Sequence, residues 1–260
     1  MGGIWLKQLQ TQTKFNLVAF RRNPAATFFT IILPLVFLVL FTSIFGNEEV
    51  GEGRRVATFY VPALLALAII SATLVNLATT LTARREQGVL KRVRSTPLQP
   101  WIFIVAQGLA GVILSILMTV IFIGVGRVAF DVTVQAVGVL PLLISVMVGA
   151  ASFSALGVAL TVIIPSEEAA PAVTNALVLP LYFISDIFII GSDGESAVGG
   201  LPATIANFFP VKHLGIALSE SFDPFATEIP FPIEHWLVVL AWGAFGLLIS
   251  IWKFRWEPRR

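Results

Sequence analysis

The fold of this chain is decided by the segment Arg84-Arg85-Glu86-Gln87-Gly88-Val89-Leu90-Lys91-Arg92-Val93-Arg94-Ser95-Thr96-Pro97-Leu98. Five of these residues are Lys or Arg, although only 12% of the whole chain is charged. Long apolar runs lie on both sides of the segment. A basic segment between two apolar runs lies in water between two membrane spans, and the positive-inside rule places it in the cytoplasm. We call residues 84–98 the inner elbow.

The composition defines the class of protein. Of the 260 residues, 57% are hydrophobic, which is more apolar surface than a soluble domain can bury, so the sequence predicts an all-α membrane protein. The first apolar run begins too far from the start, and is too long, to be the core of a cleavable signal peptide, so none is expected. The chain contains no cysteine, which excludes disulfides and thiolate chemistry.

The apolar runs predict six transmembrane helices within a single domain, residues 1–260. The spans are expected at about 25–45, 56–81, 101–125, 136–164, 169–190 and 235–252. The inner elbow contributes a short helix at about 84–95, because Val89, Leu90 and Val93 recur there at helical spacing.

Two segments outside the spans also have an apolar face. Residues 3–22 predict an amphipathic helix in the cytoplasmic headgroup region, with a solvated lead-in to the first span as the alternative. The outer connection contains an apolar part, about 197–222, that Pro202 and Pro210 interrupt. It predicts a re-entrant pair of short helices that dip into the outer leaflet, with a surface-packed loop as the alternative. In the fourth span, small residues within 149–157 predict the close approach of another helix.

The distribution of basic residues sets the orientation. Thirteen of the 17 Lys and Arg residues lie in the N-terminal segment, the inner elbow and the C-terminal tail. The four in the other connections are Arg54, Arg55, Arg127 and Lys212. Because Lys and Arg are enriched in cytoplasmic segments, both termini are expected in the cytoplasm of a cell that carries this multi-pass protein in its plasma or inner membrane.

Three polar residues within the expected spans are candidates for a substrate path, because a polar group in lipid must face protein or a polar route. They are Asn76, Asn175 and Asp186. Asp186 lies near the outer end of the fifth span, where it needs a partner or water. It either contacts a substrate or a cation on the exit path, or it is an interfacial acid that reaches the outer headgroups.

The sequence argues against several kinds of chemistry. It lacks the pattern G-x-x-x-x-G-K-[ST] that cradles a nucleotide phosphate, so the chain is not expected to have an ATPase site or a cofactor of its own. Its two histidines form no metal-ligand pattern, and no Ser, His and Asp set is placed for nucleophilic catalysis. The basic residues gather at a membrane face, which argues against nucleic-acid binding.

Within the inner elbow, residues 85–98 closely resemble a signature of the type-2 ABC exporter permeases, a family that includes the membrane subunits of daunorubicin-resistance-like drug and lipid exporters. In that family the pattern reads roughly R-E-x-G-T-L-[EK]-R-L-R-x-T-P-L, between the second and third spans. Residues 209–213, Phe-Pro-Val-Lys-His, resemble the family's outer element N-P-[LV]-x-[HY]. The chain departs from the family at Val89, where Thr is usual, and at Asp186, where Gly is usual.

The resemblance implies a machine driven by ATP. Such permeases work as dimers of identical or different chains with two cytoplasmic ATPase subunits, which bind ATP and Mg²⁺ and push on a coupling helix in the elbow. The ATPase-coupling residues implied on this chain are Arg85, Glu86, Val89, Leu90, Arg92, Val93 and Arg94. Its apolar ridge and Glu86 would enter a groove of the ATPase, and its arginines would pair with an acidic rim. The alternative is that the elbow serves only to determine topology.

A second inner turn offers less specific information. Glu167 and Glu168 follow the fourth span, and they form either another ATPase contact or a plain helix start, since acids favour that end of a helix.

Three functions remain open from the sequence. The first is the membrane subunit of a bacterial ABC exporter for amphipathic drugs, antibiotics or lipids. The second is the same machine exporting a polysaccharide or another glycoconjugate. The third is a secondary transporter or channel that works without ATP. The spans carry few of the ionisable groups that an ion-coupled carrier needs, which disfavours the third function.

Overall fold

The computed structural model describes residues 2–45, 49–50, 54–95, 98–188 and 198–254. Within them, five helices are long and apolar enough to cross a membrane. They are Pro24–Phe45, Val56–Glu86, Trp101–Phe130, Ala136–Leu160 and Ile233–Lys253. Ala169–Ile184 is a shorter apolar helix at the place of the expected fifth span. The protein is thus an all-α membrane protein, as predicted.

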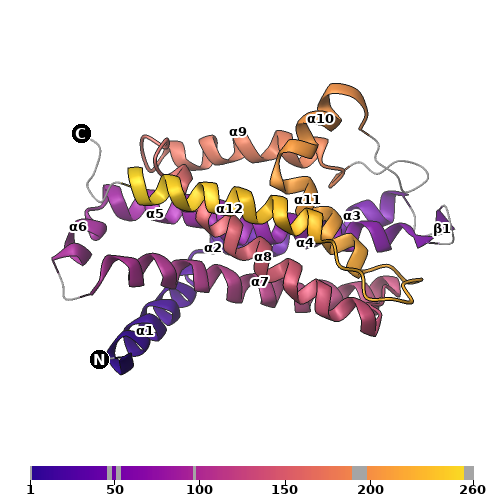
Figure 1. Ribbon diagram of the computed structural model, residues 1–260, viewed down its shortest axis with the longest axis horizontal. Coiled ribbons are helices and arrows are strands. Elements are labelled where there is room, and N and C mark those ends of the chain that lie inside the picture. Colours follow the sequence, from indigo (N-terminus) through magenta and orange to yellow (C-terminus); the bar gives the residue numbers. More distant parts are fainter. Residues whose placement is uncertain (1, 46–48, 51–53, 96–97, 189–197, 255–260) are drawn as a thin grey trace.

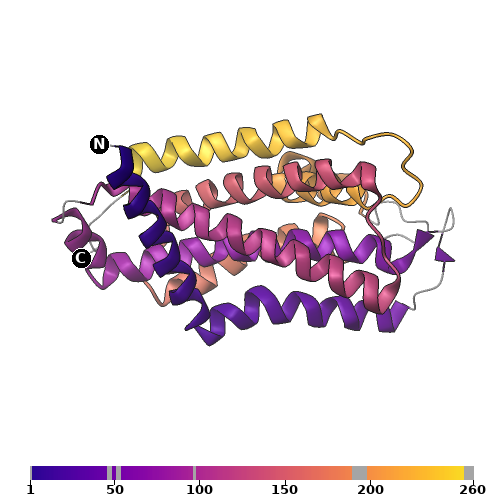
Figure 2. The same cartoon turned by 90° about the horizontal axis from the view of Figure 1, so that it is seen from below.

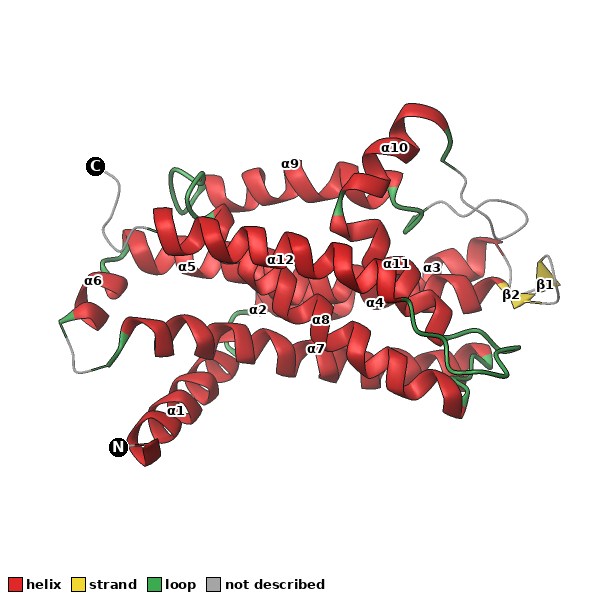
Figure 3. Cartoon of the chain, in the orientation of Figure 1, coloured by secondary structure: helices red, strands yellow, loops and turns green. Residues whose placement is uncertain are grey.

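The elements follow one another along the chain with short connections. Before the elbow they are α1 (Gly2–Arg21), α2 (Pro24–Thr27), η1 (Phe28–Ile32), α3 (Leu33–Phe45), β1 (Glu49–Val50), β2 (Arg54–Arg55), α4 (Val56–Ile70), η2 (Ser71–Val75) and α5 (Asn76–Glu86). From the elbow on they are α6 (Val89–Arg94), α7 (Pro100–Phe130), α8 (Ala136–Leu160), α9 (Ala169–Ile184), α10 (Gly200–Phe208), α11 (Pro210–Ser221) and α12 (Ile233–Lys253). Figure 3 shows that helices dominate and that the two-residue strands form one small antiparallel pair.

The long helices run side by side along the length of the molecule (Figures 1 and 2). α6 and the end of α12 lie at one end, which we call the inner end. β1 and β2 lie at the opposite, outer end. α1 crosses α7 obliquely near the inner end and contacts it along much of its length. The bundle therefore places the inner elbow and α1 together at one end.

The second span is the centre of the bundle. In its most apolar stretch 83% of the residues are buried, compared with 22% in the first span. α4 is apolar on all sides, so other helices must surround it rather than cover one stripe. η1 and η2 are π-helical turns within the first two spans, where a backbone N–H reaches back five residues instead of four.

The small residues of α8 bring three helices close together, as predicted. A Cβ added to Gly243 of α12 would lie 2.6 Å from the Ser152 hydroxyl oxygen, and one added to Gly246 would lie 2.9 Å from the Leu156 backbone nitrogen. A Cβ added to Gly157 would lie 2.8 Å from the carbonyl oxygen of Leu74 in η2. Backbones that approach this closely exclude larger side chains at these positions.

Two short helices form the expected outer segment, and we call α10 and α11 the outer hairpin. Pro210 opens α11 at a position where a proline needs no backbone N–H. α11 packs between α4, α8 and α12, so it lies inside the bundle rather than on its surface. The Ser145 hydroxyl of α8 donates to the carbonyl of Ala217 (3.2 Å) and accepts from Trp236 Nε1 (2.8 Å), joining three helices. That the hairpin dips into the outer leaflet remains a prediction.

A pair of histidines fastens the outer hairpin to α12. His213 Nε2 lies 2.8 Å from the carbonyl oxygen of Asn207, so it carries the proton when the ring is neutral. His213 Nδ1 then accepts from His235 Nδ1, 2.8 Å away. This leaves His235 Nε2 unprotonated and 4.0 Å from the Glu220 carboxylate, whose pKa burial raises.

The helix bounds differ from the expected spans in two places. α9 ends at Ile184 instead of continuing to about residue 190, because Ser185 leaves the helical conformation and Asp186 adopts a left-handed one, with φ 57°. α7 continues to Phe130, about one turn beyond the expected end, and stops where Asp131 is also left-handed. Residues with positive φ end these helices because they cannot continue a right-handed turn.

We predict that Gly138→Ala destabilises the protein by about 1–3 kcal/mol, the usual range for overpacking. A Cβ at this position of α8 would lie 2.2 Å from the carbonyl oxygen of Ser221, a backbone atom that cannot move without shifting α11. Gly215→Ala in α11 is the matched control, because nothing lies within 4 Å of its Cβ. Thermal unfolding of the purified proteins in detergent measures both. Equal melting temperatures for the two variants would contradict the close packing of α8 and α11.

Candidate functional site

The inner elbow is two helices rather than the single helix expected at about 84–95. α5 continues the second span as far as Glu86, and Gly88 then adopts a left-handed conformation with φ 70°. The N–H of Gly88 donates to the carbonyl of Arg85, which closes the end of α5. α6 begins at Val89 and ends at Arg94. The break arises because a glycine is the residue that most readily takes this conformation and ends a helix.

Arg85 lies inside the protein. Its side chain is 2% exposed, and its guanidinium donates to the carbonyls of Thr161 (2.7 Å) and Ile164 (3.0 Å). These carbonyls follow the C-terminal end of α8, where a helix leaves acceptors without partners and favours a cation. The contact expected between Arg85 and an acidic rim is therefore corrected: the side chain joins α5 to α8 within this chain.

Leu90 also points inward. It is fully buried in a cluster with Leu77, Leu81, Phe103 and Val158, and Val93 packs against the same cluster. The apolar ridge expected to enter an ATPase groove is corrected in the same way, because Leu90 and much of Val93 anchor α6 to the bundle. Val89 is half-buried and stays partly accessible. The periodic pattern was read correctly as an apolar face, but this face covers the protein's own spans.

The outward side of the elbow is charged. Lys91 and Arg92 are exposed, and Glu86 is half-buried with its carboxylate 3.6 Å from Arg85. The side chain of Arg94 lies outside the described part of the structure. In the neighbouring inner turn Glu167 and Glu168 are exposed. Gln87 Nε2 donates to both carboxylate oxygens of Glu167, at 3.2 Å each, so the two inner turns form one surface.

We predict that Arg85→Met lowers the stability of the protein by about 3 kcal/mol, because two buried carbonyls lose hydrogen bonds from a charged donor. Arg92→Met is the matched control, since it removes the same charge from an exposed position seven residues away. Melting temperatures in detergent compare the two. An Arg85→Met protein as stable as the control would show that the clamp on α8 contributes nothing.

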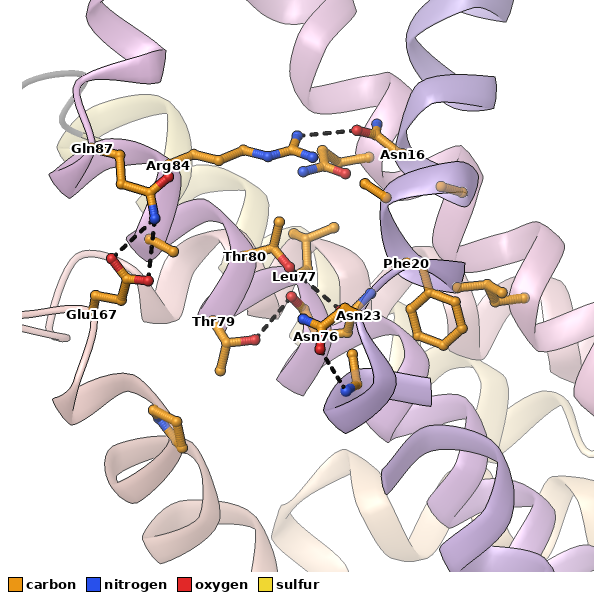
Figure 4. Close-up of a pocket in the computed structure, with 17 residues that line it drawn as sticks. Asn16, Phe20, Asn23, Asn76, Leu77, Thr79, Thr80, Arg84, Gln87 and Glu167 are labelled. Carbon is orange, nitrogen blue, oxygen red and sulfur yellow. Dashed lines mark hydrogen bonds between the residues drawn. The ribbon is translucent and has the colours of Figure 1, made fainter. Parts of the chain in front are cut away.

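A polar cavity of about 540 Å³ lies next to the elbow (Figure 4), and we call it the inner cavity. α1, α5, α7 and the turn before α9 supply its walls. Arg84 Nη1 donates to the side-chain oxygen of Asn16 across the cavity (3.0 Å). The Arg84 guanidinium lies 5.8 Å and 5.5 Å from the ring centres of Phe15 and Phe103, a cation–π arrangement that fixes its position.

An apolar cavity of about 400 Å³ adjoins the inner cavity, and we call it the upper chamber. Both π-helical turns line it, through Thr30 of η1 and Ser71 of η2. The residues that line both cavities are Asn23, Ala26, Asn76, Thr79 and Pro171. The two spaces therefore meet and form a passage that is polar at the inner end and apolar beyond it.

The structure brings together two of the three polar residues expected to line a substrate path. Asn76 lines both cavities, and its side-chain oxygen accepts from Thr80 Oγ1 at 3.4 Å. Asn175 is exposed and lines the upper chamber. Asp186 is not among the residues that line either cavity: its carboxylate lies 3.5 Å from Lys212 Nζ of the outer hairpin. Asp186 thus has the protein partner that its burial requires, in place of outer headgroups.

Sequence reasoning did not identify three residues of the inner cavity. They are Asn16, Arg84 and Gln107. Asn16 lies in the helix that crosses α7, and it is 4% exposed where the apolar face of an amphipathic helix was expected. A polar residue among the buried positions of α1 is the signal that could have revealed this wall. Arg84 was counted only as a topology charge, because its direction depends on where α1 crosses the bundle.

The fold and the site define a multi-span membrane subunit whose elbow and cavities meet at one end of the bundle. A family model described as "ABC-2 type transporter" matches residues 7–193. The chain therefore belongs to the ABC-2 type transporter family, whose members are membrane subunits of ABC transporters and associate with an ABC ATPase.

Two relatives illustrate this membership. The chain is 28% identical to the daunorubicin resistance ABC transporter permease protein DrrB1 of Streptomyces coeruleorubidus over 208 residues, which cover 78% of this chain and 71% of that protein. It is 25% identical to the protein named transport permease YvfS of Bacillus subtilis strain 168 over 174 residues, which cover 66% of this chain and 70% of that protein.

Proposed function

We propose that this chain is the membrane subunit of an exporter that moves amphipathic molecules out of a bacterial cell, using ATP hydrolysed by two separate cytoplasmic ATPase subunits bound to a permease dimer. The observation that carries the proposal is the passage formed by the inner cavity and the upper chamber beside the charged elbow. A space that is polar at one end and apolar at the other matches a cargo with the same two parts. The name of the relative DrrB1 supports a drug as the cargo.

The ATPase contact is the outward side of the two inner turns. Lys91 and Arg92 offer positive charge, and Glu167 and Glu168 offer negative charge beside it. Interfaces with charges of both signs favour one register of docking and raise the rate of association. Val89 is the apolar residue that remains for the centre of this contact, while Arg94 and Glu86 are expected at its edge.

Movement of α6 reaches the passage through contacts within this chain. Leu90 fixes α6 to Leu81 of α5 and to Val158 of α8. Arg85 ties the same stretch of α5 to the end of α8, so the three elements move as one body. α5 continues without interruption into η2, which borders the upper chamber. Because π-helical turns are weaker points in a helix and recur at functional sites, η2 is the place where this movement changes the passage.

We predict that the purified chain has no ATPase activity and that it stimulates its ATPase partner. The double variant Lys91→Glu and Arg92→Glu should weaken this association at least tenfold without lowering the melting temperature, because both side chains are exposed. The control is Arg22→Glu, which also reverses an exposed charge but lies outside the elbow. Co-purification and ATPase assays measure the effect. Full stimulation by the double variant would remove the elbow from the coupling mechanism.

The cargo route is tested by filling the upper chamber. Asn175→Trp should lower export of a fluorescent amphipathic amine several-fold, because a large side chain then projects into the chamber from α9. Ala176→Trp is the control, since this neighbouring residue is exposed and does not line either cavity. Transport into inverted vesicles with ATP measures both. Transport driven by an ion gradient without the ATPase would instead favour a secondary transporter.

A further inference from the structure

The inner cavity contains two amide groups that lack partners. Asn16 Nδ2 and Gln107 Nε2 are both buried and have no hydrogen-bond partner among the described residues. The side chains are 4% and 5% exposed, and both line the cavity. Because Asn16 accepts from Arg84 with its oxygen, its NH₂ group must point elsewhere. Buried donors without acceptors are costly, so an acceptor from outside the chain is expected here.

Arg84 completes this wall of donors. Its guanidinium is held between Phe15 and Phe103, and one N–H reaches Asn16, which leaves other N–H groups of the fork for a ligand. A planar fork of this kind binds the oxygens of a phosphate group in a defined geometry. Arg84, Asn16 and Gln107 together present the donors that a phosphate group accepts from.

The opposite wall carries a negative charge. Glu167 lies there, and Gln87 holds its carboxylate (Figure 4). Arg84 and Glu167 are the two charged residues among those that line the cavity, so the walls have no net charge. A simple anion would satisfy Arg84 but would face the carboxylate of Glu167. A group with a phosphate at one end and an ammonium at the other satisfies both walls.

The upper chamber supplies the space for an apolar part of the same molecule. It continues from the inner cavity, and Phe29, Leu33, Val178 and Leu179 are among the apolar residues that line it. Phe29 and Leu179 are 60% and 45% exposed, so the chamber opens onto the surface of the spans that faces lipid or another chain. An acyl chain can therefore enter from the side while its headgroup remains in the inner cavity.

We propose that the inner cavity is a binding site for a phosphoethanolamine headgroup, with the phosphate on Arg84, Asn16 and Gln107 and the amine on Glu167. The ligand is a phosphatidylethanolamine of the inner leaflet, whose acyl chains occupy the upper chamber. This site does not depend on the proposed export function, because binding is measured on the chain without its ATPase. A primary ammonium offers three N–H donors to Glu167, whereas a choline offers none.

The test is native mass spectrometry of the purified full chain in detergent, titrated separately with phosphatidylethanolamine, phosphatidylglycerol and phosphatidylcholine. We expect the wild type to bind phosphatidylethanolamine most tightly, and Arg84→Ala to weaken that binding about tenfold, a change of one decade in Kd. Glu167→Gln should remove the preference for phosphatidylethanolamine over phosphatidylglycerol. Arg22→Ala is the control, because it removes an exposed charge that does not line the cavity.

Gln107→Leu separates binding from folding. It removes a buried donor without a partner, so the lipid-free protein should keep or raise its melting temperature while lipid binding weakens. Soluble O-phosphoethanolamine tests the source of the headgroup: if it stabilises the protein as much as the lipid does, the ligand is a soluble phosphoamine and the lipid assignment is overturned. Equal binding of all three lipids, unchanged by Arg84→Ala and Gln107→Leu, would overturn the site itself.

Discussion

The rest of the inner end depends on one interaction, the hydrogen bonds from the buried Arg85 guanidinium to the carbonyls of Thr161 and Ile164. They satisfy acceptors that the end of α8 leaves without intrahelical partners, and they do so with a charge that complements the helix dipole. Because α5 is thereby fixed to α8, the turn at Gly88 starts α6 from a defined point. The elbow, the inner cavity and the charged outer surface of α6 all take their positions from this clamp.

Most of the fold could be predicted from the sequence, because apolar runs long enough to cross a bilayer have few alternatives. The small residues of α8 and the two short helices of the outer segment were also identified correctly. The end of α9 could not be predicted, since the apolar run continues beyond Ile184 while the helix stops at a left-handed Asp186. Local composition does not reveal a backbone conformation that an ion pair with Lys212 accompanies.

The site could be predicted only in part, because a sequence pattern shows that a face is apolar or charged but not what covers it. Leu90 and Arg85 have the residue types of a docking surface, yet both are buried against α8 and its end. Asn76 and Asn175 were identified because polar residues are rare in spans. Arg84 and Asn16 were not, since they meet only where α1 crosses the bundle, and no spacing along the chain brings residues 68 positions apart together.

The π-helical turn η2 has a consequence for how this protein can change in evolution. Such a turn accommodates one residue more than a regular helix, so losing a single residue between Ser71 and Val75 would restore a regular helix and rotate everything after it by about 100°. α5 would then turn Arg84 away from α1 and Arg85 away from the end of α8. The length of this stretch is therefore constrained more strictly than its residue types, and homologous chains should align here without gaps.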